Sequence, residues 1–489
     1  MAKALAANLD VGEIKKKTLG GAASFFLRTL LLNAIGLAAN LILGGELTLR
    51  DFAVYGIVTQ IIGVLTFFSD VGLASSLIQQ QKPPSKKDYA TVFWLQMSLA
   101  IFIVLCCVAV VKSGVYASQL QGEGEWLLYA LACSFVIGTL KTVPSIKLTR
   151  ELNFAKFVIP QILEQLVFNG LLIILVINGW GLKAYTWAIW ARTLIGTAVM
   201  LYLVPFWPGV NFSLASLRCS LQFGVKFQFN DLLSRLKDQF FYLFVAMQLP
   251  PEQFGLISFS KNWSMYPYNL TVQNIMAITF PTFSRLQDNP GLLRRALEKT
   301  IYFITLVIFP LLVGMCLFFY PLTQVIGKYQ KWESALLSFV CFTLSIAPAA
   351  ISSPLTNILN AVGKINQTLK LMIFWTLLTW LLTPFLMRFY GFNGVAIASL
   401  LISLTSGVTV AMVKKYLPFS LWPQVKVPLL GSLFMVAFAL PLQSVWRESL
   451  PAALVGGGLT LLVYFLAVII FGRRQLCLEL ASLLSKGKS

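Results

Sequence analysis

Long apolar runs, separated by short polar segments, follow one another along almost the whole chain. An α-helix needs about 20 apolar residues to cross the hydrocarbon core of a bilayer. Fourteen runs of this length are found among the 489 residues. They lie at about 21–43, 52–79, 89–111, 124–146, 157–178, 184–205, 222–247, 254–284, 300–320, 333–357, 369–388, 393–413, 426–443 and 450–471. The sequence therefore predicts an all-α polytopic membrane protein with about 14 transmembrane helices.

The composition excludes the other broad classes of protein. Hydrophobic residues make up 57% of the chain and charged residues 11%, whereas a soluble domain carries about 25% charged residues and a disordered chain is poor in apolar ones. No histidine is present, which excludes catalytic triads, metal sites and proton relays that use imidazole. The seven cysteines show no C-x-x-C spacing, so we expect neither a metal site nor a disulfide framework.

The distribution of Lys and Arg predicts the orientation of the helices. If the N-terminus is cytoplasmic, 24 of the 38 Lys and Arg residues fall in the inside segments and 7 in the outside loops. Cytoplasmic loops carry the excess of these residues in membrane proteins, so both termini are expected to be cytoplasmic. Most of the net charge of +20 then faces anionic lipid headgroups, and no nucleic-acid partner is needed to explain it.

The chain shows a weak internal repeat at an offset of about 202 residues. The segments RDFAVY at 50–55 and EQFGLI at 252–257 each begin an unusually long apolar run that ends at a charged inside loop. Paired helical bundles of this kind are usual in transporters, with the substrate site between them near the membrane midplane. We expect a cytoplasmic or interfacial segment (1–20), a first lobe of six helices (21–215), a second lobe of six (216–425), and a final helix pair with a cytoplasmic tail (426–489).

Ionisable residues within the apolar runs need a reason, because each costs at least ~2.5–3.5 kcal/mol at the bilayer centre. The seventh run carries the largest number of them. At helical spacing, Asp231, Arg235 and Asp238 fall on one stripe and can pair with one another. Lys237 points to another side and lies too centrally to reach the interface.

Away from the ends of the fourteen runs, cations outnumber carboxylates by seven to four. A surplus of this sign favours an anionic substrate such as a phosphate or pyrophosphate; the alternative is that the charged groups are pairs which fix helix packing. Lys141 and Lys226 lie toward the inner ends of their runs. The candidate substrate-binding cations are Arg28, Arg192, Arg235, Lys237 and Lys261. The candidates for ion coupling or charge pairing are Asp70, Glu164, Asp231 and Asp238.

Several segments, spread over both expected lobes, carry a resemblance to a known family. They are DFAVYG at 51–56 leading to SDVGLASSLIQ at 69–79, FPTFSRLQD at 280–288 followed by LLRR at 292–295, LTNILNAVG at 355–363, and GFNGVA at 391–396. In these motifs the chain resembles the polysaccharide transporter (PST/Wzx) family. That family belongs to the multidrug/oligosaccharidyl-lipid/polysaccharide (MOP) flippase superfamily.

The resemblance implies two six-helix lobes in a V, plus a helix pair, in the bacterial inner (plasma) membrane. It implies a flippase that moves an undecaprenyl-pyrophosphate-linked oligosaccharide outward by alternating access, for exopolysaccharide, O-antigen or capsule synthesis. No cofactor is implied beyond coupling to H⁺ or Na⁺. The expected partners are membrane lipids and the lipid-linked substrate, with a polysaccharide polymerase and glycosyltransferases as further candidates. Lipid II flippases of the superfamily have cavity cations on the first and eighth helices, where Arg28 and Lys261 lie.

Two other functions remain open at this point. An ion-coupled multidrug or small-molecule antiporter of the same superfamily would prefer a net-negative cavity, which the surplus of cations argues against. A membrane enzyme acting on lipid-linked sugars would be expected to carry a catalytic cluster on a sizeable outer loop or to use histidine. The outside loops are about 5–13 residues long and histidine is absent, so we do not expect an enzyme.

Overall fold

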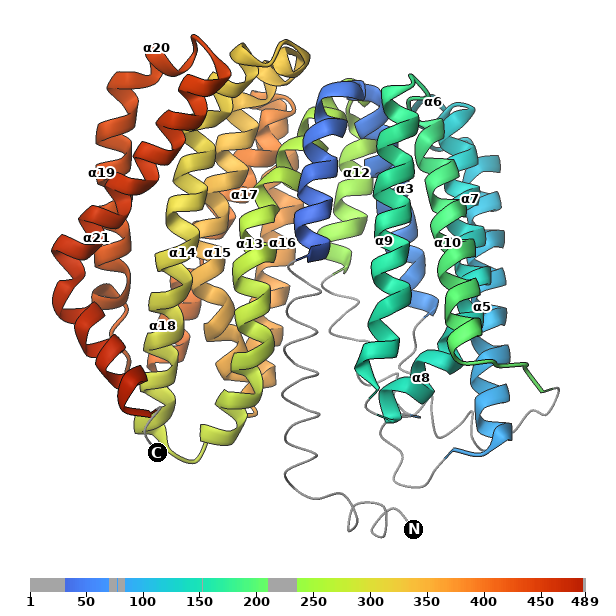
Figure 1. Cartoon of the computed structure of the whole chain (residues 1–489), viewed down its shortest axis with the longest axis horizontal. Coiled ribbons are helices and arrows are strands. Elements are labelled where there is room, and N and C mark those ends of the chain that lie inside the picture. Colours follow the sequence, from blue (N-terminus) through green and yellow to red (C-terminus); the bar gives the residue numbers. More distant parts are fainter. Residues whose placement is uncertain (1–30, 70–76, 78–83, 152, 210–234, 487–489) are drawn as a thin grey trace. The chain divides into compact units, whose positions relative to one another are not determined.

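The computed structural model of the chain describes residues 31–69, 77, 84–151, 153–209 and 235–486. All regular elements within these ranges are helices (Figure 1), which confirms the all-α class. The chain divides into two compact units, Met1–Gly255 and Leu256–Ser489. The lobe boundary expected between 215 and 216 lies outside the described residues, so the division into lobes of six helices stays a prediction.

The first unit is a bundle of helices that pack side by side. The α9 helix packs on α10, α10 on α7, and α7 on both α5 and α3. Its described elements are a helix at Leu31–Glu46, α3 (Leu49–Ser69), α5 (Lys86–Lys112), α6 (Ala117–Leu120), α7 (Glu123–Gly138), η1 (Thr139–Lys141), α8 (Thr142–Arg150), α9 (Phe154–Ile177), α10 (Lys183–Leu203), η2 (Leu236–Phe240), α12 (Phe241–Gln248) and the first turn of α13 (Pro251–Leu286).

The second unit contains the rest of α13 and the helices that follow it. The α14 helix is central, because it packs on α15, α19 and α21. The elements after α13 are α14 (Pro290–Val325), η3 (Gly327–Ala335), α15 (Leu336–Ala361), α16 (Ile365–Tyr390), α17 (Asn393–Leu404), α18 (Gly407–Lys414), α19 (Trp422–Ala439), η4 (Leu440–Leu442), α20 (Gln443–Trp446) and α21 (Leu450–Lys486).

Capping side chains determine where two helices of the first unit, α3 and α5, begin. The Thr48 hydroxyl accepts a hydrogen bond of 3.1 Å from the N–H of Asp51, whose carboxylate accepts one of 3.0 Å from the N–H of Thr48. Ser85 and Asp88 form the same reciprocal arrangement before α5. Such pairs satisfy N–H groups that the first turn of a helix leaves without partners.

Eleven helices of the described residues are long and apolar enough to cross a membrane. They coincide with the second to sixth and the ninth to fourteenth apolar runs, which confirms these runs as candidate spans. The first run is described only over Leu31–Glu46, and the seventh only from residue 235. The eighth forms α13, which begins 202 residues after α3, at the offset of the repeat. The full count of 14 and the cytoplasmic termini stay predictions.

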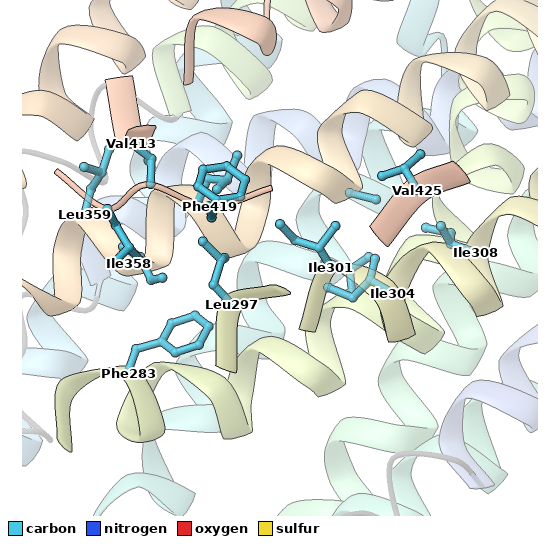
Figure 2. Packing of buried hydrophobic residues seen from close by; sticks show 14 of the residues in the cluster. Phe283, Leu297, Ile301, Ile304, Ile308, Ile358, Leu359, Val413, Phe419 and Val425 are labelled. Atoms are coloured by element: carbon cyan, nitrogen blue, oxygen red, sulfur yellow. The ribbon is translucent and has the colours of Figure 1, made fainter. Parts of the chain in front are cut away.

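A large apolar core holds the second unit together (Figure 2). On α14, Ile301, Ile304 and Ile308 are fully buried, and they belong to the same cluster as Ile358 of α15 and Val425 of α19. The lipid around a membrane protein is as apolar as these side chains, so close packing, more than transfer from water, holds such helices together. The core therefore depends on the fit between neighbouring helices.

A close backbone contact in the second unit lies between the end of α16 and the start of α17. A Cβ atom added at Gly394 would lie 2.5 Å from the carbonyl carbon and oxygen of Leu386 and 2.6 Å from the nitrogen of Met387. These are backbone atoms of α16, which cannot rotate away as a side chain does. Only glycine fits at this position with the helices at their present separation.

We expect Gly394→Ala to destabilise the protein by about 1–3 kcal/mol, the usual cost of overpacking, because the backbones of α16 and α17 must move apart. The measurement is the thermal unfolding temperature of the purified protein in detergent. Gly407→Ala is the matched control, because an added Cβ at Gly407 on α18 meets nothing within 4 Å. Equal unfolding temperatures for the two variants would contradict the predicted close contact.

Candidate functional site

The fourth membrane span is not one regular helix. It runs from Glu123 to Arg150 as α7, the 3₁₀ turn η1 and α8. Pro144 lacks the N–H that would bond to the carbonyl four residues earlier, and the tight turn lies at this place. Turns of this kind within a helix often mark functional positions.

Lys141 is the last residue of the η1 turn and lies in the second half of the span, 18 residues after Glu123. It precedes Arg150, the end of α8, by nine residues, which is about 14 Å of helix in a hydrocarbon core of about 30 Å. The sequence places this lysine near the inner end of its run, because apolarity falls off at about residue 146. The helix continues past this run to Arg150, and the placement of Lys141 toward the inner end of the span stays a prediction.

Lys141 forms an ion pair with Glu164 of α9. Its Nζ lies 2.5 Å from Oε1 of Glu164, and the two side chains are 22% and 24% exposed. Glu164 follows the first residue of α9 by ten residues, or about 15 Å, so it lies well inside the span and away from both of its ends. Pairing offsets much of the cost that either charge alone would have at this depth.

The α10 helix shapes the other side of this pair. A Cβ atom at Gly196 would lie 1.9 Å from Oε1 of Glu164, so the carboxylate occupies the space that this glycine leaves. One turn away, the guanidinium carbon of Arg192 lies 4.8 Å from the centre of the Phe168 ring. Phe168 follows Glu164 by four residues and Arg192 precedes Gly196 by four, as expected for antiparallel helices whose faces meet.

Three aromatic rings connect this site to α3. The rings of Tyr55 and Tyr185 stack with their centres 4.1 Å apart, and those of Phe168 and Tyr185 lie 6.4 Å apart. Tyr185 is 3% exposed and Phe168 is 9% exposed. Arg192 is thus placed over a ring that is itself held by packing, which limits the directions in which its guanidinium can point.

Two buried polar atoms beside the ion pair have no hydrogen-bond partner among the described residues. They are Oε1 of Gln161, one turn before Glu164 on α9, and Oγ1 of Thr197, next to Gly196 on α10. A buried polar atom without a partner costs about 1–3 kcal/mol. Such atoms are candidates for contact with a bound water, ion or substrate group.

A second polar contact of the first unit joins α3 to the seventh apolar run. Arg235 donates from Nη1 to the carbonyl of Gly63 and, over 3.1 Å, to Oγ1 of Thr66. The next residues, Leu236–Phe240, form the π-helical turn η2. Such turns are rare in proteins as a whole, and many of those that occur lie at functional sites. The side-chain oxygen of Gln239 in this turn is buried without a partner among the described residues.

The π-helical turn also bears on the charged stripe predicted for the seventh run. That stripe assumes 3.6 residues per turn, a spacing that an i→i+5 turn does not keep. Asp238 pairs with its neighbour Lys237, with Oδ1 and Nζ 3.5 Å apart and side chains 48% and 26% exposed. Ion pairs this exposed contribute little to stability. Asp231 lies outside the described residues.

The structure brings only some of the predicted site residues together. Glu164 and Arg192 lie one turn apart on the facing helices α9 and α10, and Lys141 joins them. Arg235, Lys237 and Asp238 lie at or next to the η2 turn. Lys261 is half-buried on α13 in the second unit. Arg28 and Asp70 lie outside the described residues.

Sequence reasoning missed three parts of this site, namely Gly196, Phe168 and the pairing of Lys141 with Glu164. The signal for the first two was present, because Glu164 and Phe168 share one face of α9, and Arg192 and Gly196 share one face of α10. What was lacking was the knowledge that these two faces meet. The ion pair was missed because it joins two different spans, and hydropathy does not record which spans touch.

The charges at this site suit the binding of an anion. Among the described residues, Glu164 is ion-paired with Lys141, and Arg192 has no ion pair with a carboxylate. Arginine presents a planar fork of donors that matches phosphate oxygens. Within the part of the chain that is described, no three Cys, Asp or Glu side chains gather into a metal-binding group.

Comparison with known sequences identifies relatives in the synthesis of cell-surface polysaccharides. A family model for polysaccharide biosynthesis proteins matches residues 46–337, more than half of the chain. The lipopolysaccharide biosynthesis protein WzxC of Escherichia coli (strain K12) is 25% identical over 381 residues, which cover 75% of this chain and 74% of WzxC. The teichuronic acid biosynthesis protein TuaB of Bacillus subtilis (strain 168) is 22% identical over 358 residues, 72% of each chain.

Comparison with solved structures identifies the fold. The lipid II flippase MurJ in an inward closed conformation superposes with a TM-score of 0.73 at 14% identity, covering 92% of this chain and 99% of MurJ. An inward-facing multidrug resistance MATE transporter of the MOP superfamily gives a TM-score of 0.56 at 15% identity, covering 80% and 99%. The chain therefore has the fold that these transporters share.

Breaking the ion pair from the lysine side should destabilise the protein more than removing both charges. A fully buried pair that loses one partner costs about 3–5 kcal/mol. Because both side chains here are about a quarter exposed, we expect about 1–3 kcal/mol for Lys141→Met. The double variant Lys141→Met/Glu164→Gln should recover part of this loss, since no uncompensated charge remains. Unfolding temperatures of the four proteins measure the coupling, and purely additive effects would contradict it.

Gly196→Ala should expel the Glu164 carboxylate from its present position, because an added Cβ overlaps it. We expect a loss of about 1–3 kcal/mol from overpacking, and a much smaller loss in a Glu164→Ala background, where the overlap is gone. Gly170→Ala on α9 is the control, because an added Cβ there meets nothing within 4 Å. The prediction fails if Gly196→Ala costs the same with and without the glutamate side chain.

Proposed function

The chain belongs to the polysaccharide biosynthesis protein family, and on that premise we propose that it is a flippase for lipid-linked oligosaccharides. This membership agrees with the sequence motifs by which the chain resembles polysaccharide transporters. The chain is a multi-pass membrane protein with the fold of MOP-superfamily transporters. Bacterial proteins of this kind lie in the inner membrane.

The proposed substrate is an oligosaccharide linked to undecaprenyl pyrophosphate, on its way to exopolysaccharide, O-antigen or capsule. The observation that carries this proposal is a cluster of charged and polar groups within apolar helices, with Arg192 available to an anion. Burying charge at this depth is costly and usually marks a transport pathway. A pyrophosphate carries the negative charge and the oxygen acceptors that a guanidinium binds in pairs.

In the proposed mechanism, the substrate anion competes with Glu164 for Lys141. Arg192, held over the Phe168 ring, binds a phosphate oxygen first, and Lys141 then turns from the carboxylate toward the anion. The carboxylate that is left takes up a proton or Na⁺, because an unpaired charge at this depth is costly. Alternating access would then carry anion and counter-ion together from one side to the other.

The membrane potential acts on any net charge that crosses the membrane with the substrate. One elementary charge moved across 100 mV is worth about 2.3 kcal/mol. A pyrophosphate that moves outward releases this energy when the inside is negative. A cation bound with it would reduce the energy released, but it would also neutralise the charge within the membrane. The sequence offers Asp70, Asp231 and Asp238 as further coupling carboxylates beside Glu164.

The main alternative is an ion-coupled antiporter of multidrug or small-molecule type, which the fold shared with MATE transporters supports. A cation-binding cavity needs a carboxylate that is free to attract the cation. Of the described carboxylates within the spans of the first unit, Glu164 is already paired with a lysine. A flippase for an anionic substrate is therefore favoured, and an enzyme that acts on lipid-linked sugars is the least favoured reading.

Replacing Arg192 by Gln should slow flipping at least tenfold, because one charge-assisted hydrogen bond to a phosphate is worth about 1.5–3 kcal/mol. The measurement is the fraction of lipid-linked oligosaccharide that remains on the inner leaflet of membrane vesicles. Arg192→Lys keeps the charge but not the planar fork, so an intermediate rate is expected.

Arg388→Gln is the matched control, because this arginine is exposed at the last turn of α16 and should not affect flipping. Unfolding temperatures establish that each variant is folded. A folded Arg192→Gln protein that flips substrate at the wild-type rate would contradict the proposed role of Arg192.

A further inference from the structure

A cluster of cations lies at the end of the second unit where α15 and α18 end and α16 begins. We define it as the lysine cluster, formed by Lys364, Lys370, Lys414 and Lys415. All four side chains are exposed. By the orientation predicted from Lys and Arg, this end faces the cytoplasm.

Among the residues that the structure describes, no carboxylate pairs with these four lysines. The chain contains no Asp or Glu between Glu333 and Glu448, a stretch that includes α15, α16, α17, α18 and α19. At the same end, Glu298 of α14 accepts from Nε of Arg294 and from the N–H of Ser420, both at 2.9 Å. The cluster is therefore an uncompensated cationic surface.

Local structure holds part of the cluster in place. Gly363 has a φ of +75°, which ends α15 and lets the N–H of Lys364 bond to the carbonyl of Leu359 over 2.7 Å. This turn closes the LTNILNAVG motif. It directs Lys364 over the ring of Tyr416, with Nζ 5.1 Å from the ring centre.

Tyr416 links the two sides of the cluster. Its hydroxyl oxygen accepts a hydrogen bond of 3.2 Å from Nε2 of Gln367 on α16. The hydroxyl hydrogen remains available to donate to another acceptor. Beneath this surface, Leu359, Val413 and Phe419 belong to the apolar core of the unit (Figure 2), so the cluster rests on a packed base.

Exposed apolar stripes lead from the cluster along two neighbouring helices. On α16, Lys370 is followed at spacings of three and four residues by Ile373, Leu377, Leu381 and Phe385, all between 42% and 71% exposed. On α17 and α18 the stripe of Leu401, Leu404, Val408 and Ala411 ends at Lys415. The α16 helix packs on α17, and both α16 and α18 pack on α15, so the two apolar stripes lead to one group of cations.

We propose that the lysine cluster binds the phosphate headgroup of an anionic phospholipid whose acyl chains lie along the two stripes. A phospholipid combines one negative phosphate with apolar chains, and this is the combination that the surface presents. An acidic protein partner would match the lysines but not the stripes, which belong within the hydrocarbon of the bilayer. The proposal does not depend on which substrate the protein transports.

The test measures binding of phosphatidylglycerol to the full chain by native mass spectrometry, with phosphatidylcholine as the neutral comparison. A lysine near an anionic surface contributes roughly fivefold in affinity. Lys364→Gln/Lys415→Gln should therefore weaken phosphatidylglycerol binding by roughly 30-fold and leave phosphatidylcholine unaffected. Tyr416→Phe, which keeps the ring under Lys364 and removes one donor, should weaken it severalfold.

The matched control is Arg295→Gln/Lys299→Gln, which removes two exposed charges of α14 at the same end of the unit. This control should retain wild-type affinity. A loss equal to that of the cluster variant would show general attraction to a basic end and overturn the proposal, as would unchanged affinity in the cluster variant. Free glycerol phosphate that binds as tightly as phosphatidylglycerol would overturn the role of the apolar stripes.

Discussion

The cost of charge within a bilayer is the constraint on which the first unit depends. Lys141 and Glu164 are stable within their spans only as a pair, and three features of the local packing make that pair fit. These are the 3₁₀ turn before Pro144, which carries the lysine, the close approach of α10, and the missing side chain at Gly196. The close packing of α10 holds the helices together, and Gly196 leaves the space that the Glu164 carboxylate occupies.

Arg192 complements the pair by adding a positive charge that no described carboxylate neutralises. Phe168, Tyr185 and Tyr55 hold the surroundings of this arginine rigid, and a rigid donor loses less entropy when it binds. The same excess of positive charge recurs at the lysine cluster of the second unit, where it lies at a helix end. The two proposals differ in where the cations lie along the helices. A cation within a span suits a transported anion, and an exposed cation at a helix end suits a lipid headgroup.

Hydropathy was sufficient to locate the second to sixth and ninth to fourteenth spans, since a helix that crosses lipid must be apolar over a length set by the bilayer. It did not predict the ion pair of Lys141 with Glu164, because hydropathy does not record which helices touch. The stripe of Asp231, Arg235 and Asp238 was drawn at regular spacing, and the π-helical turn at 236–240 departs from that spacing. No pattern in a single sequence predicts such a turn.

From the sequence alone follow the membrane class, the candidate spans, the surplus of intramembrane cations and the family resemblance. These properties are sums over residues or short motifs, and they do not require knowledge of which helices touch. Only the tertiary structure decided that Glu164 pairs with Lys141, that Arg192 lies over Phe168, and that Gly196 makes room for a carboxylate. Each of these contacts joins residues more than 20 positions apart, and in lipid the choice of helix neighbours depends on close packing that hydropathy does not record.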